Sequence, residues 1–85
     1  MARSFVAVLG KDDRRINLIV DDSFKEYRGR VPLGMLKQKM IDGLGSANAL
    51  VELPEGDPNV SLFRERNYRI YMVEDNIVYE RPPIR

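Results

Sequence analysis

The chain has 85 residues, with 14 Lys or Arg against 13 Asp or Glu, so its net charge at pH 7 is +1. This length allows one domain with one core, and the balanced charge gives no electrostatic footprint for nucleic acid. Because the sequence has no histidine and no cysteine, it excludes disulfides, imidazole or thiolate zinc sites, and Ser-His-Asp or Cys-His catalysis. We therefore expect a single cytoplasmic domain over residues 1–85 that needs no cofactor and does not enter a membrane.

The first two apolar segments predict an N-terminal β-hairpin. Phe5–Leu9 is apolar at every position, which is typical of a strand that is central in a sheet or covered on both faces. Residues 10–15 are polar turn formers. Ile16–Val20 then places its first, third and fifth side chains, all apolar, on one face of a second strand.

One main helix is predicted in the middle of the chain. Before it, Ser23 and Glu26 fit a capping box, but Gly29 ends that segment after about one turn, so only a short helical connector is expected. Pro32 then suits the first turn of a helix. Four apolar residues follow at spacings of three, four and four, which predicts a helix over about 32–44: Leu33, Leu36, Met40 and Leu44.

The C-terminal half is predicted to be mostly β-structure. Ala49–Leu53 is expected to form a third strand, and Val60–Phe63 a short edge strand. Tyr68–Val73 and Ile77–Glu80 flank an acidic turn, which predicts a C-terminal hairpin. The element order favours an α+β domain with the main helix packed across one face of an antiparallel or mixed sheet.

Arg and Tyr residues gather in this C-terminal part. The candidate partner-binding residues are Arg64, Arg66, Tyr68, Arg69, Tyr71, Tyr79 and Arg81. Tyr and Arg are enriched as anchors in protein interfaces, and Arg with Tyr can also hold the phosphates and unpaired bases of single-stranded RNA. A third interpretation follows from strand alternation, which turns Tyr68, Ile70 and Met72 inward and leaves Arg69 and Tyr71 on a solvated face among acidic side chains.

The acidic doublets do not predict a metal site. Asp12-Asp13, Asp21-Asp22 and Glu74-Asp75 fall in expected turns or at a helix start, where Asp is favoured for local hydrogen bonding, and their spacing is not that of an EF-hand. The glycines match no nucleotide-binding motif. We expect neither a metal nor a nucleotide.

The segment Leu62–Tyr79 carries a Tyr-Arg-Ile strand, the acidic turn and an Ile/Val strand. It resembles the C-terminal β-strands of the RelE/ParE toxin superfamily. This resemblance implies cleavage of messenger RNA on the ribosome without a histidine, through Arg64, Arg69, Tyr71 and Arg81. In that superfamily a strand and a long helical pair stand at the N-terminus, where the present sequence predicts a hairpin.

The first half of the chain is similar in element order to a ubiquitin-type β-grasp. That order is a hairpin over Phe5–Val20, a helix, and the strand Ala49–Leu53. This similarity implies a non-conjugated interaction domain, since the paired C-terminal glycines of a conjugated modifier are missing.

The leading hypothesis is a small protein-binding module, such as an adaptor, an inhibitor or a virus- or plasmid-type accessory protein, which acts through a sheet face or a strand edge. Binding is favoured over catalysis, although Arg, Lys and Tyr chemistry stays open. The alternatives are a His-free RNA-acting toxin or other RNA-binding protein, and a structural homo-oligomer. In the oligomer, the N-terminal strand or the 77–81 edge would pair across a two-fold axis.

Overall fold

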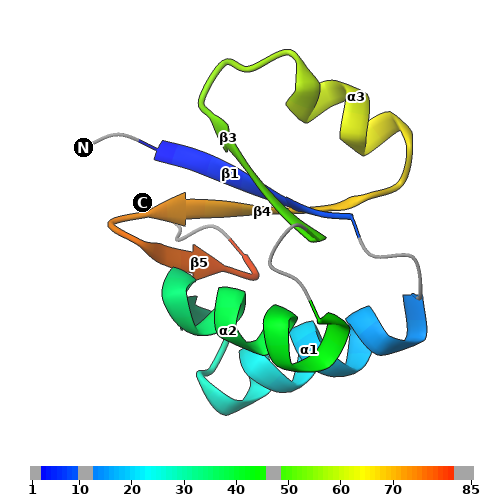
Figure 1. Cartoon of the computed structure of the whole chain (residues 1–85). Coiled ribbons are helices and arrows are strands. Elements are labelled where there is room, and N and C mark those ends of the chain that lie inside the picture. The colour runs from blue at the N-terminus through cyan, green and yellow to red at the C-terminus, as the bar shows by residue number, and fades with distance from the viewer. Residues whose placement is uncertain (1–2, 10–12, 46–48, 82–85) are drawn as a thin grey trace.

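The fold is an α+β domain with one five-stranded antiparallel sheet. The computed structural model describes residues 3–9, 13–45 and 49–81. The sheet has the order β2-β5-β4-β1-β3, with α1 and α2 on one face and α3 on the other (Figure 1). Along the chain the elements are β1 (Arg3–Val8), α1 (Asp13–Glu26), β2 (Arg30–Pro32), α2 (Leu33–Leu44), β3 (Leu50–Pro54), α3 (Asn59–Glu65), β4 (Arg69–Glu74) and β5 (Ile77–Tyr79).

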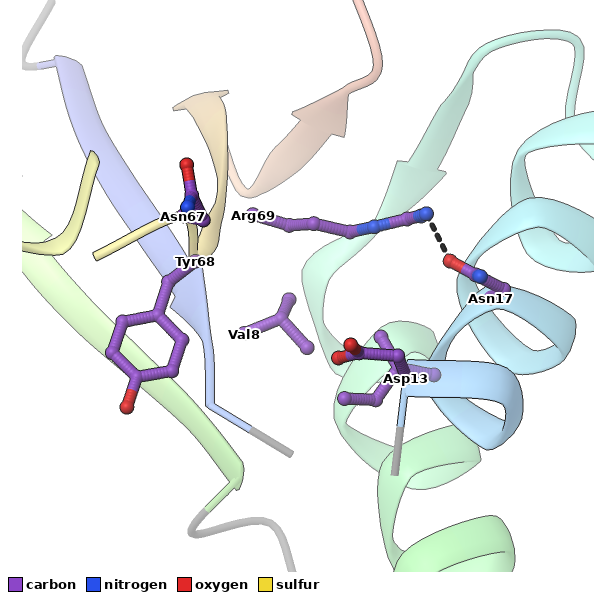
Figure 2. A pocket seen from close by; sticks show the side chains of 7 residues that line it. Val8, Asp13, Asn17, Asn67, Tyr68 and Arg69 are labelled. Atoms are coloured by element: carbon purple, nitrogen blue, oxygen red, sulfur yellow. Dashed lines mark hydrogen bonds between the residues drawn. The ribbon is translucent and has the colours of Figure 1, made fainter. Parts of the chain in front are cut away.

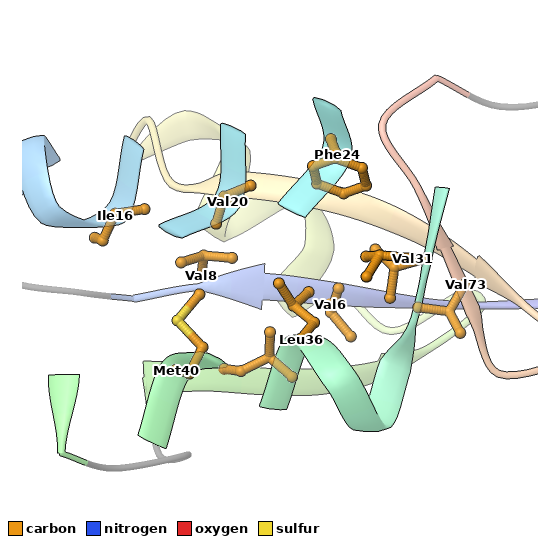
Figure 3. Packing of buried hydrophobic residues seen from close by; sticks show 11 residues of the cluster. Val6, Val8, Ile16, Val20, Phe24, Val31, Leu36, Met40 and Val73 are labelled. Atoms are coloured by element: carbon orange, nitrogen blue, oxygen red, sulfur yellow. The ribbon is translucent and has the colours of Figure 1, made fainter. Parts of the chain in front are cut away.

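Strand β1 is central, as its continuous apolar sequence predicts. It pairs with β3 on one side and with β4 on the other. Its alternate residues face two different clusters, because Val6 and Val8 pack toward α1 and α2 while Ala7 belongs to the smaller cluster under α3. Figure 3 shows the larger cluster, in which side chains of both helices meet β1. A strand covered on both faces needs apolar residues at every position.

The predicted N-terminal hairpin is wrong, because residues 16–20 lie inside α1. Ile16, Val20 and Phe24 are spaced by four and are buried on one helical face. Leu18, which the strand pattern placed on one face with Ile16 and Val20, is 65% exposed. The prediction of only a short helical connector around residues 23–29 is also wrong, since α1 runs from Asp13 to Glu26. Without the hairpin, the β-grasp order is not present.

The Ser23 capping box fails for a related reason. Ser23 is buried in the third turn of α1, where its hydroxyl donates to the carbonyl of Ile19 at 2.6 Å. The Ser23 hydroxyl is thus hydrogen-bonded within the helix and does not cap a helix start.

The expected edge strand over 60–63 is wrong as well, because these residues belong to α3. The Asp57 carboxylate accepts a hydrogen bond from the N–H of Asn59 at 2.8 Å, and Pro58 already has helical angles, φ −63° and ψ −21°. Both features favour a helix start at this point. Val60 and Phe63, three residues apart, then pack on the sheet.

The other expected elements are confirmed. Helix α2 begins directly after Pro32 and ends at Gly45, whose φ of 78° is left-handed. Strands β4 and β5 form the C-terminal hairpin. Its two central residues, Asp75 and Asn76, have φ of 54° and 61°, as the tight turn between twisted antiparallel strands requires.

Strand β2 was not expected from the sequence, because it has only three residues and one of them is proline. Its pairing with β5 places β5 inside the sheet, between β2 and β4. The oligomer hypothesis therefore named the wrong edges, since β1 and β5 each have a neighbour on both sides. The edges of the sheet are β2 and β3.

Helices α1 and α2 approach closely where Gly43 meets Ile19. A Cβ atom added to Gly43 would lie 2.2 Å from Cδ1 of Ile19. Next to this contact, Lys39 of α2 bonds to Glu26 of α1 at 3.1 Å. The glycine thus leaves the space that Ile19 needs in order to pack between the helices.

We expect Gly43→Ala to lower the free energy of unfolding by about 1 kcal/mol, since the cost of overpacking exceeds the gain in helix propensity. Gly34→Ala is the matched control in the same helix, because a Cβ there meets nothing within 4 Å; it should stabilise the chain by up to about 1 kcal/mol. Urea unfolding of both variants measures the difference. Equal stabilisation by the two changes would show that Ile19 does not constrain the helix pair.

Candidate functional site

A pocket of about 210 Å³ lies between the N-terminal part of α1 and the start of β4 (Figure 2). It is smaller than the sites that usually hold cofactors or drug-sized ligands, about 300 to 1,000 Å³. Polar groups from both elements line it, including the Arg69 side chain. The lining residues are Val8, Asp13, Ile16, Asn17, Asn67, Tyr68 and Arg69.

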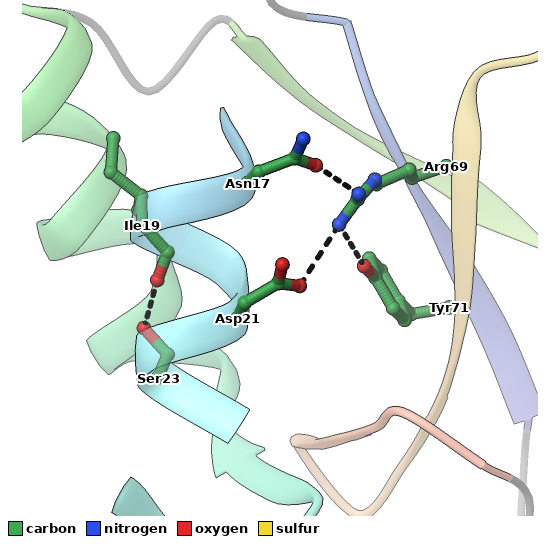
Figure 4. A network of polar contacts seen from close by, with 6 residues as sticks. All are labelled: Asn17, Ile19, Asp21, Ser23, Arg69 and Tyr71. Atoms are coloured by element: carbon green, nitrogen blue, oxygen red, sulfur yellow. Dashed lines mark hydrogen bonds and ion pairs between the residues drawn. The ribbon is translucent and has the colours of Figure 1, made fainter. Parts of the chain in front are cut away.

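Arg69 joins β4 to α1 along one wall of this pocket. Its Nη2 donates to Oδ1 of Asn17, and its Nη1 lies 3.1 Å from Oδ1 of Asp21 (Figure 4). Asn17 and Asp21 are four residues apart, so α1 presents both acceptors on the same face. The guanidinium therefore acts as a cross-link between helix and sheet.

Tyr71 supports this arrangement from the next position on the same face of β4. Its hydroxyl accepts a hydrogen bond from Nη1 of Arg69 at 3.5 Å, and its ring lies 4.9 Å from that of Phe24 between centroids. Burial raises the pKa of Tyr71, and the adjacent Arg69 cation only partly offsets that effect. Tyr71 thus stays protonated near neutral pH and is poorly suited to act as a general base.

The pKa of Arg69 is also raised. Burial acts to lower it, but that effect is outweighed by the hydrogen bond to Tyr71, by the charge that Tyr71 carries once it is ionised at strongly alkaline pH, and by the hydrogen bond and charge of the Asp21 carboxylate. The site therefore keeps a fixed positive charge beside a neutral phenol.

The expectation that Arg69 and Tyr71 face solvent among acidic residues of the C-terminal strands is wrong. Both are half-buried, and the acidic partner of Arg69 comes from α1. The reason lies in the N-terminal half, because a hairpin over 5–20 would have left this face of β4 without α1. Ile70 packs with the cluster on the opposite face.

The other candidate residues lie in two further places. Arg64 and Tyr68 are at the α3 end of β4, where the Arg64 guanidinium lies 5.8 Å from the centre of the Phe5 ring and Tyr68 contacts Phe63 edge-on at 5.6 Å. Arg66, at the end of α3, is exposed. Tyr79 is half-buried in β5, and Arg81 is exposed beyond it.

The seven candidates therefore do not form one surface. We use the name α3 surface for the exposed group that includes three of them: Leu62, Arg64, Arg66 and Tyr68. Leu62 was missed because residues 60–63 were expected to form an edge strand, whereas they belong to α3, which leaves Leu62 exposed. Asn17 and Asp21 were missed as partners of Arg69, although their i, i+4 spacing was available as a signal once residues 13–26 are read as helix.

The acidic doublets are separated by the fold. Asp13 is in the first turn of α1, Asp21 and Asp22 lie in its middle, and Glu74 ends β4, while Asp12 is outside the described residues. Within residues 3–9, 13–45 and 49–81, no three acidic side chains come together in a way that could hold a metal ion. In the same residues, no helix has the length and apolar character needed to cross a bilayer.

Comparisons of this chain with protein families, with curated proteins and with solved structures found no match.

We expect the stability of the chain to fall at alkaline pH in a way that depends on Tyr71. Because its folded pKa is raised above the ordinary value of 10.0, the folded chain holds this proton after the unfolded chain has released it. The contribution is complete below that value and is lost as the pH rises through the folded pKa.

Tyr71→Phe keeps the ring on Phe24 but removes the titrating hydroxyl. Urea unfolding in buffers on either side of pH 10 should therefore show a smaller alkaline loss for the variant than for the wild type. An equally steep loss in both proteins would mean that the burial of the Tyr71 hydroxyl does not control this pH dependence.

Proposed function

We propose that the chain is a small protein-binding module and that its contact surface is the α3 surface. The observation that supports this best is the exposure of two large hydrophobic side chains there: Leu62 and Tyr68 each keep 37% of their accessible surface. Two arginines accompany them in the same short segment of chain, Arg64 and Arg66. Tyr and Arg are the side chains most enriched at the energetic centres of protein interfaces.

Two of these side chains are held in place before a partner arrives. The backbone N–H of Tyr68 bonds to the carbonyl of Phe63 at 3.0 Å, and the Tyr68 ring lies against the Phe63 ring. Arg64 lies over the Phe5 ring. Such preorganisation lowers the entropy lost on binding. The chemistry of the surface suits a partner with apolar side chains next to carboxylates.

Arg69 and Tyr71 have a different role in this proposal. They connect β4 to α1 and pack against the core, so replacing them would disturb the fold as well as any interface. They are therefore poor probes of binding, and Tyr68 and Arg64 are the better ones.

We expect Tyr68→Ala and Arg64→Ala each to weaken capture of a protein partner by about tenfold or more, the size typical of an interface anchor. Immobilised wild-type and variant proteins would be compared by pull-down from lysate, followed by titration of the captured partner. Leu18→Ala is the matched control, because Leu18 is an exposed apolar residue on α1, across the sheet from α3. Thermal unfolding would confirm that all variants fold.

Undiminished capture by the Tyr68 and Arg64 variants, or an equal loss with Leu18→Ala, would rule out the α3 surface as the contact.

A second candidate function is binding or cleavage of RNA. The observation that favours it is the N-terminal part of the fold, because β1 is followed by two helices on one face of the sheet, α1 and α2, with the short strand β2 between them. The resemblance of residues 62–79 to the RelE/ParE superfamily implies a strand and a helical pair at that place. Of the four implied positions, Arg64 and Arg81 are exposed, whereas Arg69 and Tyr71 bond to each other and Arg69 to Asp21.

If this second function holds, expression of the chain should arrest growth, and RNA should co-purify at low salt and be lost steeply as the salt concentration rises. Replacing Arg64 and Arg81 together by Ala should then relieve the arrest. Harmless expression with no bound nucleic acid would exclude this function.

A further inference from the structure

The two edges of the sheet differ in the backbone groups that they present. The N–H of Glu80 donates to the carbonyl of Gly29, and the N–H of Leu33 donates to the carbonyl of Asn76. Because pairing alternates along the ladder, the backbone N–H and C=O positions of Arg30 and Pro32 in β2 point away from β5. The Arg30 N–H already donates to the carbonyl of Tyr27 at 3.3 Å, and proline has no N–H. The β2 edge therefore has no donor to offer another strand.

The β3 edge, in contrast, has backbone N–H groups that point outward. The N–H of Leu9 donates to the carbonyl of Ala49 at 2.6 Å, and pairing alternates along an antiparallel ladder. Val51 and Leu53 therefore bond toward β1, while the N–H and C=O groups of Leu50 and Glu52 point away from it. Within the part of the chain that the structure describes, no backbone bond from another element reaches those outward groups.

We propose that β3 pairs antiparallel with β3 of a second copy of the chain, about a two-fold axis at Val51. In this register Leu50 lies opposite Glu52 of the second copy, and the same pair recurs on the other side of the axis. Each of these pairs exchanges two N–H···O bonds, so all the outward donors of both edges are used. The edge is thus complementary to itself, as a two-fold interface requires.

The charges select this register. An axis at Glu52 would place two carboxylates opposite each other and would pair Leu50 with Pro54, which has no N–H to give. With the axis at Val51, Glu52 instead faces an apolar residue. A charged side chain normally protects an edge strand, but here Lys37 of α2 lies 2.7 Å from the Glu52 carboxylate and neutralises it.

Glu52→Pro tests the interface, because the Glu52 N–H points away from β1 and its loss removes no bond within the chain. We expect the wild type to dimerise in a dilution series followed by analytical ultracentrifugation, and Glu52→Pro to weaken the dimer at least tenfold. Glu52→Ala is the matched control, since it keeps the N–H and should still dimerise. Thermal unfolding at low concentration would show that the proline variant is folded.

A cysteine variant tests the register even if the proline variant fails to fold. Residues on the axis of an antiparallel pair lie close enough for a disulfide, and the chain has no cysteine of its own. Val51→Cys should therefore form a covalent dimer rapidly under mild oxidation, whereas Leu18→Cys, on the exposed face of α1, should not. A wild type that stays monomeric at its highest soluble concentration, or a dimer without the Val51→Cys cross-link, would overturn the proposal.

Discussion

Strand β1 needs cover on both of its faces, and the rest of the structure is arranged to provide it. Val6 and Val8 require α1 and α2 on one face, and Ala7 requires α3 on the other. The helices in turn depend on this strand, because the buried residues of α1 and α2 pack in the same cluster as Val6 and Val8. Burial of the apolar side chains of this strand and of the helices that cover it stabilises the domain.

The sequence predicted the parts of the fold in which local signals agree with the tertiary environment. Helix α2 has a proline before its start, an apolar stripe and a glycine at its end, and the C-terminal hairpin has a turn that tolerates positive φ. Residues 16–20 were assigned wrongly because the apolar positions of so short a segment fit both an alternating period and a helical spacing of four. The longer series of Ile16, Val20 and Phe24 has the spacing of a helix. Strand β2 is held by its pairing with β5, which no local pattern reveals.

The candidate site shows how one wrong element changes the expected role of a distant residue. Arg69 and Tyr71 were correctly placed on a strand, but their surroundings depend on what covers that strand, and the cover comes from α1, some fifty positions earlier in the chain. Arg64, Arg66 and Tyr68 were chosen as candidates from residue type alone. They lie apart from Arg69 because the chain turns between the end of α3 and the start of β4. Asn67, with φ of 63°, lies in this turn.

The position of β1 also governs the kinetics of folding. Strand β1 pairs with residues far along the sequence, since Arg3 lies opposite Glu74 and Val8 opposite Arg69. Contacts between residues so far apart in sequence slow folding, because the intervening chain must be ordered before they form. On the ribosome, β1 is made before β4, so the side of β1 that pairs with β4 has no partner strand until β4 has emerged. The central strand of the finished protein therefore has an unpaired edge, which favours aggregation, while the chain is being made.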